Sequence, residues 1–542
     1  MKFLETSQLL ISTLSPVHIG CGEDYEPTNY VIDNHTLYEF DPGAAQQALT
    51  AQDRRELLRI VENPGNQRML QEVQAFFYHR RPALMRIAQR RVPVVLKLVE
   101  FYQSRVGKTV QVEGDGSQLV NKLAIGRTFF NPLSGAPLLP GSSLKGAMRT
   151  ALLDGINGGR PLAGQERSLS LQQRLFRYDC FEQDPMRLIH LMDAGFTDGA
   201  GAGSELCFAV NRRRKAPKPG DNSTKSQAEQ RDLYQLLECI PAARFRVFAG
   251  QLTMQQVDSI HNDRDRLPAL PLRWNTKQIA AACNAFYRPQ LEAELQQMQE
   301  RGFLHTDWAA LIEGLLKGPL GQRLDNHQAF LLRVGRHSGA ESVTLNGVRS
   351  IKILLGKDSM TRQMRSENRS TGTSWWLAAG DTQARSGMLP FGWLLVEWHP
   401  IGQPQPAGRE VQEALAGLAT EYTNWIARER QQAEMAARRE AETQAQQALA
   451  AARAAFSPEQ KAIDELRGWF ETDRKTKQLK PVGRVVGTLN RLLKEGVGWP
   501  LADRQALADL AEKIFSQKSV GGDDQVMQER EAKIQRLRKA TP

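Results

Sequence analysis

The sequence predicts an α+β fold followed by an all-helical C-terminal extension. Two observations predict this class. Between residues 8 and 398, short apolar runs bounded by turn-forming residues interleave with stretches of helical periodicity, which is the pattern of a mixed α and β protein. After residue 402 the composition shifts to Ala, Gln, Glu and Arg, and only helical periodicity remains. At 542 residues the chain also exceeds what one hydrophobic core usually supports, so we expect several domains.

The N-terminal part predicts strand, glycine loop, hairpin and helices in that order. Residues 8–14 and 29–40 have strand character, and the second run turns at Asp33 and Asn34. Between them, SPVHIGCGEDYEP is rich in turn formers and contains Gly20 and Gly22. Residues 42–107 then place apolar residues at helical spacing among many arginines, which predicts a helical insertion.

Further strands and a helical stretch are expected in the middle of the chain. The strand predictions cover LIHLMDAGF, SELCFAVN, FRVFAGQLTM, AFLLRVGRHSG and MLPFGWLLVEW. Residues 276–317 have helical periodicity. The segment at about 212–231 has clustered cations, Pro, Gly and Ser and almost nothing to bury, so we expect a basic loop there. Residues 1–402 together form the predicted α+β region.

The C-terminal extension divides into two predicted parts. Residues 403–456 carry an apolar stripe that fades after Met435, which predicts a solvated helical spacer. Residues 457–542 contain several separate apolar helix faces, which is enough for a small helical bundle. This bundle begins with a strong helix start, because Ser457 is a favoured cap and Pro458 suits the first helical position.

Composition narrows the class of protein. The formal net charge of +11 and the pI of about 9.4 favour a polyanionic partner. No stretch approaches the roughly 18 apolar residues of a spanning helix, and the N-terminus lacks the apolar core of a signal peptide. We therefore expect a cytoplasmic protein without membrane contact. The five cysteines are scattered without metal-ligand spacing, so we expect core residues, no structural zinc and no cofactor.

The stretch PLLPGSSLKGAMRT contains the first candidate site. Gly141 permits a sharp bend and Ser142 is a candidate cap for the following helix, whose first-turn amides would then attract an anion. Lys145 and Arg149 lie one turn apart and would flank a phosphate. An ordinary capped helix with two surface cations is the alternative. The order of residues excludes a nucleoside-triphosphate loop.

Four motifs together resemble a known family. TLSPVHIGCGEDYEPTNYVID, PLLPGSSLKGAMRTALL, FLLRVGRHSG and LPFGW occur in the order found in RAMP-superfamily proteins of type III CRISPR systems. Within that family the chain is most similar to the subunits of Csm complexes (type III-A) that cap the 3′ end of the CRISPR RNA. The resemblance spans residues 9–398 and implies a ferredoxin-like, RRM-type fold. The extension after Gly402 departs from the family pattern.

The resemblance also implies which residues bind RNA. They are the two glycines of the first loop, the residues around the helix start, the basic segment and the late glycine-rich loop: Gly20, Gly22, Gly141, Ser142, Ser143, Lys145, Arg149, Arg212, Arg213, Arg214, Lys215, Gly335, Arg336, His337 and Gly339. Residues 212–225 correspond to a thumb-like hairpin near the guide. The implied partners are CRISPR RNA, target RNA, the other backbone and small subunits of the Csm complex, and host ribonucleases.

Three functions follow from these observations. By analogy with capping subunits, the favoured one is a non-catalytic RNA-binding subunit that supports guide maturation and complex assembly in antiviral defence. The second is a RAMP-type endoribonuclease, for which His18, His337 and Asp193 are the candidate catalytic residues. The third is an assembly adaptor that acts through its C-terminal helices. The sequence alone contains no recognisable pair of catalytic groups.

Overall fold

The computed structural model describes residues 3–62, 68–112, 118–120, 123–162, 164, 166–197, 203–216, 233–257, 267–357, 361, 363–418 and 421–539. The chain divides into two compact units, Met1–Arg428 and Glu429–Pro542. In the described part of the chain, no helix is long and apolar enough to cross a membrane.

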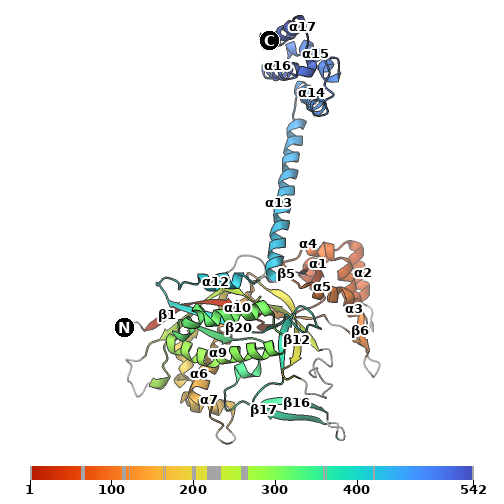
Figure 1. The fold of residues 1–542 in the computed structure, drawn as a ribbon. Helices are drawn as coiled ribbons and strands as arrows, with labels where there is room; N and C mark the ends of the chain where they lie inside the picture. Colours follow the sequence, from red (N-terminus) through yellow and green to blue (C-terminus); the bar gives the residue numbers. More distant parts are fainter. Residues whose placement is uncertain are drawn as a thin grey trace. The chain divides into compact units, whose positions relative to one another are not determined.

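A seven-stranded antiparallel sheet forms the centre of the first unit (Figure 1). Its spatial order is β15 (Ala329–Arg333), β20 (Trp393–Pro400), β1 (Leu4–Thr13), β14 (Arg244–Gln255), β11 (Ala194–Phe196) and β9 (Leu138–Leu139), and β10 (Ile189–Leu191) also pairs with β14. Every residue of β15 is buried. This burial explains the continuous apolar run AFLL, because a strand covered on both faces does not alternate.

A second sheet has six strands. Its order is β19 (Leu389–Pro390), β18 (Ser374–Ala379), β12 (Glu205–Arg213), β13 (Tyr234–Cys239), β8 (Ile125–Thr128) and β2 (Gly20–Tyr25). Smaller sheets are formed by β3 (Tyr30–Asp33), β4 (Thr36–Glu39) and β5 (Arg90–Pro93), by the hairpin of β6 (Thr109–Val112) and β7 (Gln118–Val120), and by that of β16 (Ile351–Lys357) and β17 (Met364–Arg369).

Helices surround these sheets in the first unit. They are α1 (Pro42–Ala48), α2 (Ala51–Val61), α3 (Met69–His79), α4 (Arg81–Arg86), α5 (Leu96–Arg105), α6 (Gly141–Asn157), α7 (Ser168–Phe176), α9 (Thr276–Glu300), α10 (Thr306–Lys317), α11 (Pro319–Asp325) and α12 (Arg409–Ala416). Helix α6 packs against α9, and α9 packs against β15. The buried side chains of Trp308 and Trp393 belong to the large core that these elements enclose.

The second unit is helical and has a core of its own. The long helix α13 (Glu421–Ala454) contains the boundary between the units, and α14 (Pro458–Lys475), α15 (Arg484–Glu495), α16 (Leu501–Phe515) and α17 (Asp524–Lys539) follow it. Leu466, Leu489, Leu507 and Ile514 are completely buried among these helices. Ser457 accepts the hydrogen bond from the amide of Gln460 in a full capping box, and Pro458 starts the helix. This cap confirms the predicted helix start.

The structure confirms the α+β class with a helical C-terminal region. It corrects three details. Ser142 does not cap α6, because Pro140 occupies the cap position and no side chain caps the helix. The helical stretch 276–317 is two helices, separated at residues 301–305. Cys21 and Cys180 are half-buried and are not core residues, whereas Cys207, Cys239 and Cys283 are buried.

Candidate nucleic-acid interface

Three loops that carry the predicted motifs are joined by backbone hydrogen bonds. One loop follows β1, one follows β15, and one precedes β20. The Arg336 amide donates to the His18 carbonyl at 2.8 Å, and the Gly392 amide donates to the Pro16 carbonyl at 2.8 Å. The Val334 amide donates to the Gly392 carbonyl at 2.9 Å. The motifs PVHIGCG, RVGRHSG and LPFGW therefore form one continuous structure at the ends of three strands.

Two glycines make this close junction. Gly335 has φ +81°, and a Cβ there would lie 2.2 Å from the His18 carbonyl oxygen. Gly392 has φ +92°, and a Cβ there would lie 2.3 Å from the Val334 carbonyl oxygen. Any side chain at either position would push the loops apart. In contrast, position 22 favours glycine only because of its φ of +85°, since a Cβ there would have no atom within 4 Å. A Cβ at Gly20 would make an ordinary van der Waals contact.

His18 lies beneath this junction as a buried, neutral side chain. Its Nδ1 is 2.7 Å from the Glu238 carbonyl oxygen, so the Nδ1–H donates to it. Only 1% of the residue is exposed. Burial is the largest influence on the imidazole and lowers the pKa of His18, and the nearby Arg336 lowers it further. The ring is held in a fixed orientation with its charge suppressed.

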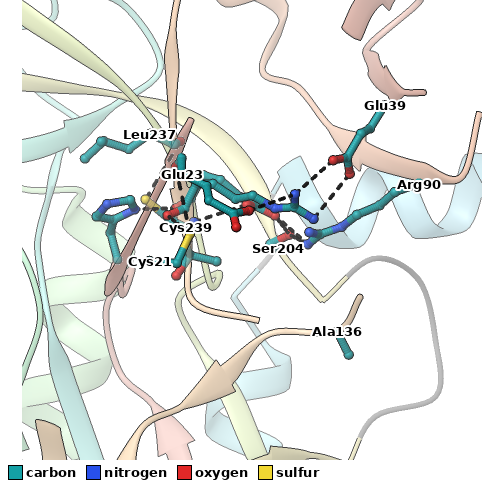
Figure 2. A network of polar contacts seen from close by, with 12 residues as sticks. Cys21, Glu23, Glu39, Arg90, Ala136, Ser204, Leu237 and Cys239 are labelled. Atoms are coloured by element: carbon teal, nitrogen blue, oxygen red, sulfur yellow. Dashed lines mark hydrogen bonds and ion pairs between the residues drawn. The ribbon is translucent and has the colours of Figure 1, made fainter. Parts of the chain in front are cut away.

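A buried ionic network adjoins His18 (Figure 2). The fully buried Glu238 carboxylate accepts hydrogen bonds from the Arg90 guanidinium, the Ser204 hydroxyl and the Thr128 amide. Figure 2 shows Ser204 beside the Arg90 guanidinium, with Glu39 close by. Arg90 belongs to β5, Thr128 to β8 and Glu238 to β13, so the network connects these three strands and supports the loop after β1.

Arg127 extends this network toward the first glycine loop. Its guanidinium binds the Glu39 carboxylate at 2.9 and 3.3 Å and lies 3.7 Å from the centre of the Phe130 ring. The Cys21 thiol lies 3.5 Å from the Arg127 carbonyl oxygen as a weak donor. Arg127 therefore acts as a structural tie between β8 and β4, with its charge paired and stacked.

The late glycine loop presents one exposed cation and one packed histidine. Arg336 is exposed. His337 has φ +65°, its Nε2 is 3.0 Å from Gln235 Oε1, and its ring stacks on Trp376 with centroids 4.8 Å apart. Burial, together with the charges of Arg336 and His18, lowers the pKa of His337 to about 3. His337 is therefore neutral at physiological pH, while Arg336 supplies a positive charge at the surface.

The start of α6 is built differently from the expectation. The Gly141 amide donates to Asp193 Oδ1 at 2.7 Å, so a carboxylate already binds the first amide of the helix. A Cβ at Gly141 would lie 2.5 Å from the Leu191 carbonyl oxygen, which explains why glycine stands there. Ser142 is exposed and Ser143 is half-buried. This glycine serves a close backbone contact with β10.

The two cations of α6 have different surroundings. Arg149 is paired with Asp184 at 2.9 Å and donates to Gln172 at 2.9 Å. Lys145 is half-buried, and its burial lowers the pKa of the ammonium group. The Tyr287 hydroxyl lies 3.1 Å from the Ala147 carbonyl of α6 and 3.3 Å from the Ser342 carbonyl, in the turn after the late glycine loop. Tyr287 thereby connects α6 with that loop.

The cations at the end of β12 also differ from one another. Arg212 is buried and donates to the carbonyls of Thr382 and Ala384. Arg213 is half-buried and Lys215 is exposed. Arg214 forms a bidentate pair with Glu341 at 2.7 and 3.0 Å. The rest of the predicted basic loop, residues 217–231, lies outside the described residues.

Sequence reasoning missed several residues of this site. Glu238 and Arg90 form the buried ion pair, Trp376 stacks on His337, and Glu341 holds Arg214. A glutamate inside the apolar strand YQLLEC was a usable signal, because a buried charge needs a partner. Over the described ranges, no group of three His, Cys, Asp or Glu side chains is placed to hold a metal ion.

Part of the chain is similar in sequence to known proteins. The sequence profile of the RAMP superfamily matches residues 10–249. This part of the chain is therefore similar to RAMP-superfamily proteins. A curated relative from Streptococcus thermophilus, the CRISPR system Cms protein Csm5, is 27% identical over 154 residues. That alignment covers 28% of this chain and 38% of the relative's length, so the chain matches well under half of the relative.

Two solved structures are also similar to this chain. One is a chain of the Csm–crRNA–target RNA ternary complex of a type III-A CRISPR–Cas system, with 16% identity and a TM-score of 0.44 over 73% of this chain and 100% of that chain. The other is Csm5 of T. onnurineus, with 14% identity and a TM-score of 0.38 over 72% of this chain and 99% of that chain.

Proposed function

We propose that this protein is a non-catalytic, RNA-binding subunit of a type III-A CRISPR interference complex. It binds CRISPR RNA near the 3′ end, caps the backbone filament, and supports guide maturation and assembly. Its partners are CRISPR RNA, target RNA and other Csm subunits. The match of residues 10–249 to the RAMP superfamily and the similarity to a Csm5 protein support this assignment.

The observation that carries the proposal is the junction of three loops beneath the exposed Arg336 (the glycine junction, residues 15–18, 334–336 and 391–393). Gly335 and Gly392 bring backbones together without side chains in the way. The packed loops hold Arg336 at the surface, and an exposed guanidinium on a rigid backbone suits a phosphodiester backbone, which needs positive charge rather than base-specific groups. Arg336, Ser142, Lys145 and Lys215 are among the exposed or half-buried predicted contacts.

The histidines favour a binding role over catalysis. A general acid or base works best with a pKa near the operating pH, whereas the pKa of His337 is about 3 and that of His18 is lowered. His337 is stacked on Trp376, and His18 donates its Nδ1–H to a backbone carbonyl. Both rings are structural members of the junction. Asp193, the third candidate, accepts the Gly141 amide.

An Arg336→Glu variant tests this function. The full-length chain is titrated with single-stranded RNA at several salt concentrations, and affinity should fall at least about tenfold with a shallower salt dependence. Lys277→Glu is the matched control, since Lys277 is an exposed cation at the start of α9. Equal affinity of the Arg336 variant and the wild type would contradict the proposal. RNA cleavage by the wild type that is lost in a His18 or His337 variant would favour the endoribonuclease.

A further inference from the structure

A groove of about 450 Å³ opens beside the late glycine loop. Its lining includes Gly335, His337 and Gly339 from that loop, Trp376 from β18, Ile353 from β16 and Arg214 from the end of β12. The groove therefore shares Gly335 with the glycine junction but extends away from it, toward the hairpin of β16 and β17. The predicted RNA contacts do not account for its aromatic and apolar walls.

One wall of the groove is aromatic. The Trp376 indole is half-buried and has the His337 ring stacked on it, with an angle of 22° between the planes. His337 is in turn backed by Phe391, at 5.4 Å between ring centres, and is held by Gln235. Trp376 and His337 both line the groove. A fixed pair of aromatic rings in a groove lining is suited to contact one more planar ring.

The groove also has polar lining residues that are held by ion pairs and hydrogen bonds. Glu341 is bound by both Nη atoms of Arg214 and accepts the Gly372 amide at 2.8 Å. The Arg214 guanidinium also lies 5.2 Å from the centre of the Trp375 ring. Arg333, which lines the groove too, is paired with the buried Glu294. These paired groups give the groove a fixed shape before any ligand binds, which reduces the ordering cost of binding.

We propose that this groove binds one nucleobase of the RNA whose backbone crosses the glycine junction, with the base lying against Trp376. The inference rests on the proposed function. A base is planar and uncharged, and a cavity of about 450 Å³ accommodates a base with its ribose. Gly335 belongs both to the junction and to the groove lining, so a nucleotide whose backbone crosses the junction has the groove beside it. Stacking accepts any of the four bases, because each has a π face.

The test compares RNA with an abasic backbone. Full-length wild type and a Trp376→Leu variant are each titrated with a single-stranded RNA and with a ribose-phosphate oligomer of equal length that has no bases. We expect the variant to bind the RNA about tenfold more weakly than the wild type and to bind the abasic oligomer equally well. Trp398→Leu is the matched control, because Trp398 is also half-buried and its indole donates to the His327 carbonyl, away from the groove lining.

A second variant fills the groove instead of removing its wall. Val343 lines the groove and is 62% exposed, so Val343→Trp adds an indole there without disturbing the core. It should weaken RNA binding to the same extent as Trp376→Leu. Wild-type RNA affinity in both variants would overturn the nucleobase site while leaving the proposed function intact. An equal loss on RNA and on the abasic oligomer would also overturn it, and failure of the wild type to bind RNA would contradict the proposed function itself.

Discussion

Replacing Gly335 by Ala should destabilise the first unit far more than replacing a glycine of similar conformation. Gly335 has φ +81° and a virtual Cβ 2.2 Å from the His18 carbonyl oxygen, while Gly402 has φ +88° and no atom within 4 Å of its virtual Cβ. The left-handed conformation alone costs an alanine about 1–2 kcal/mol. That cost applies to both positions, so the difference between the two losses of stability measures the effect of the close contact with His18.

The magnitude at Gly335 follows from the geometry. A Cβ must move away from the His18 oxygen by more than an ångström to reach normal packing, and this displacement breaks the hydrogen bond from Arg336 to His18. Losing that buried bond costs about 1 kcal/mol, and the strain of separating the loops adds to it. We expect Gly335→Ala to lower the free energy of unfolding by about 3 kcal/mol or more, against about 1–2 kcal/mol for Gly402→Ala.

The assay is thermal unfolding of the full-length chain, followed by tryptophan fluorescence. Gly335→Ala should lower the transition of the first unit by about 3 °C or more and weaken RNA binding with it. Gly402→Ala should shift the transition less and leave RNA binding unchanged. Equal shifts in the two variants would refute the reasoning, because the close approach to His18 would then carry no cost.

Three further predictions concern other parts of the structure. Glu238→Gln should lower the free energy of unfolding, measured in urea, by about 3 kcal/mol, because it leaves the buried Arg90 without its counter-charge. A loss no larger than that of a surface substitution would contradict a stabilising role of this ion pair. As the pH falls from 6.5 toward 3, the free energy of unfolding of the wild type should fall relative to that of His337→Asn. The reason is that His337 takes up a proton in the unfolded chain but stays neutral in the folded one, where its pKa is about 3. Parallel pH profiles of stability for the two proteins would contradict this. Residues 457–542, expressed alone, should unfold cooperatively when followed by circular dichroism. Leu466→Ala should lower their free energy of unfolding by about 2–5 kcal/mol. A non-cooperative transition would show that the hydrophobic core of these helices is not sufficient for independent folding.

The sequence predicted the elements whose signal is local. The strand AFLLR reads as buried because it has no polar residue before Arg333, and the cap at Ser457 depends on residues only three apart. The glycine loops were recognisable as motifs, since their order along the chain carries the family resemblance. These features need no knowledge of which segments meet in space.

The contacts of the site needed the structure. That Gly335 approaches His18, or that Arg149 is paired with Asp184, depends on segments between 35 and more than 300 residues apart. The sequence also assigned Gly141 a sharp bend, whereas a backbone carbonyl of β10 is the reason for the glycine. Trp376 carried no signal, because an aromatic residue in a strand is ordinary until its neighbour His337 is known.

The most direct measurement of the central claim is crosslinking of the native complex. The chain is co-expressed with its genomic neighbours, the complex is purified, and ultraviolet crosslinks between protein and RNA are mapped by mass spectrometry. The account predicts crosslinks from the 3′ segment of a CRISPR RNA to the loop that contains Arg336 and to residues lining the groove. A complex without RNA, or crosslinks confined to residues 457–542, would contradict it.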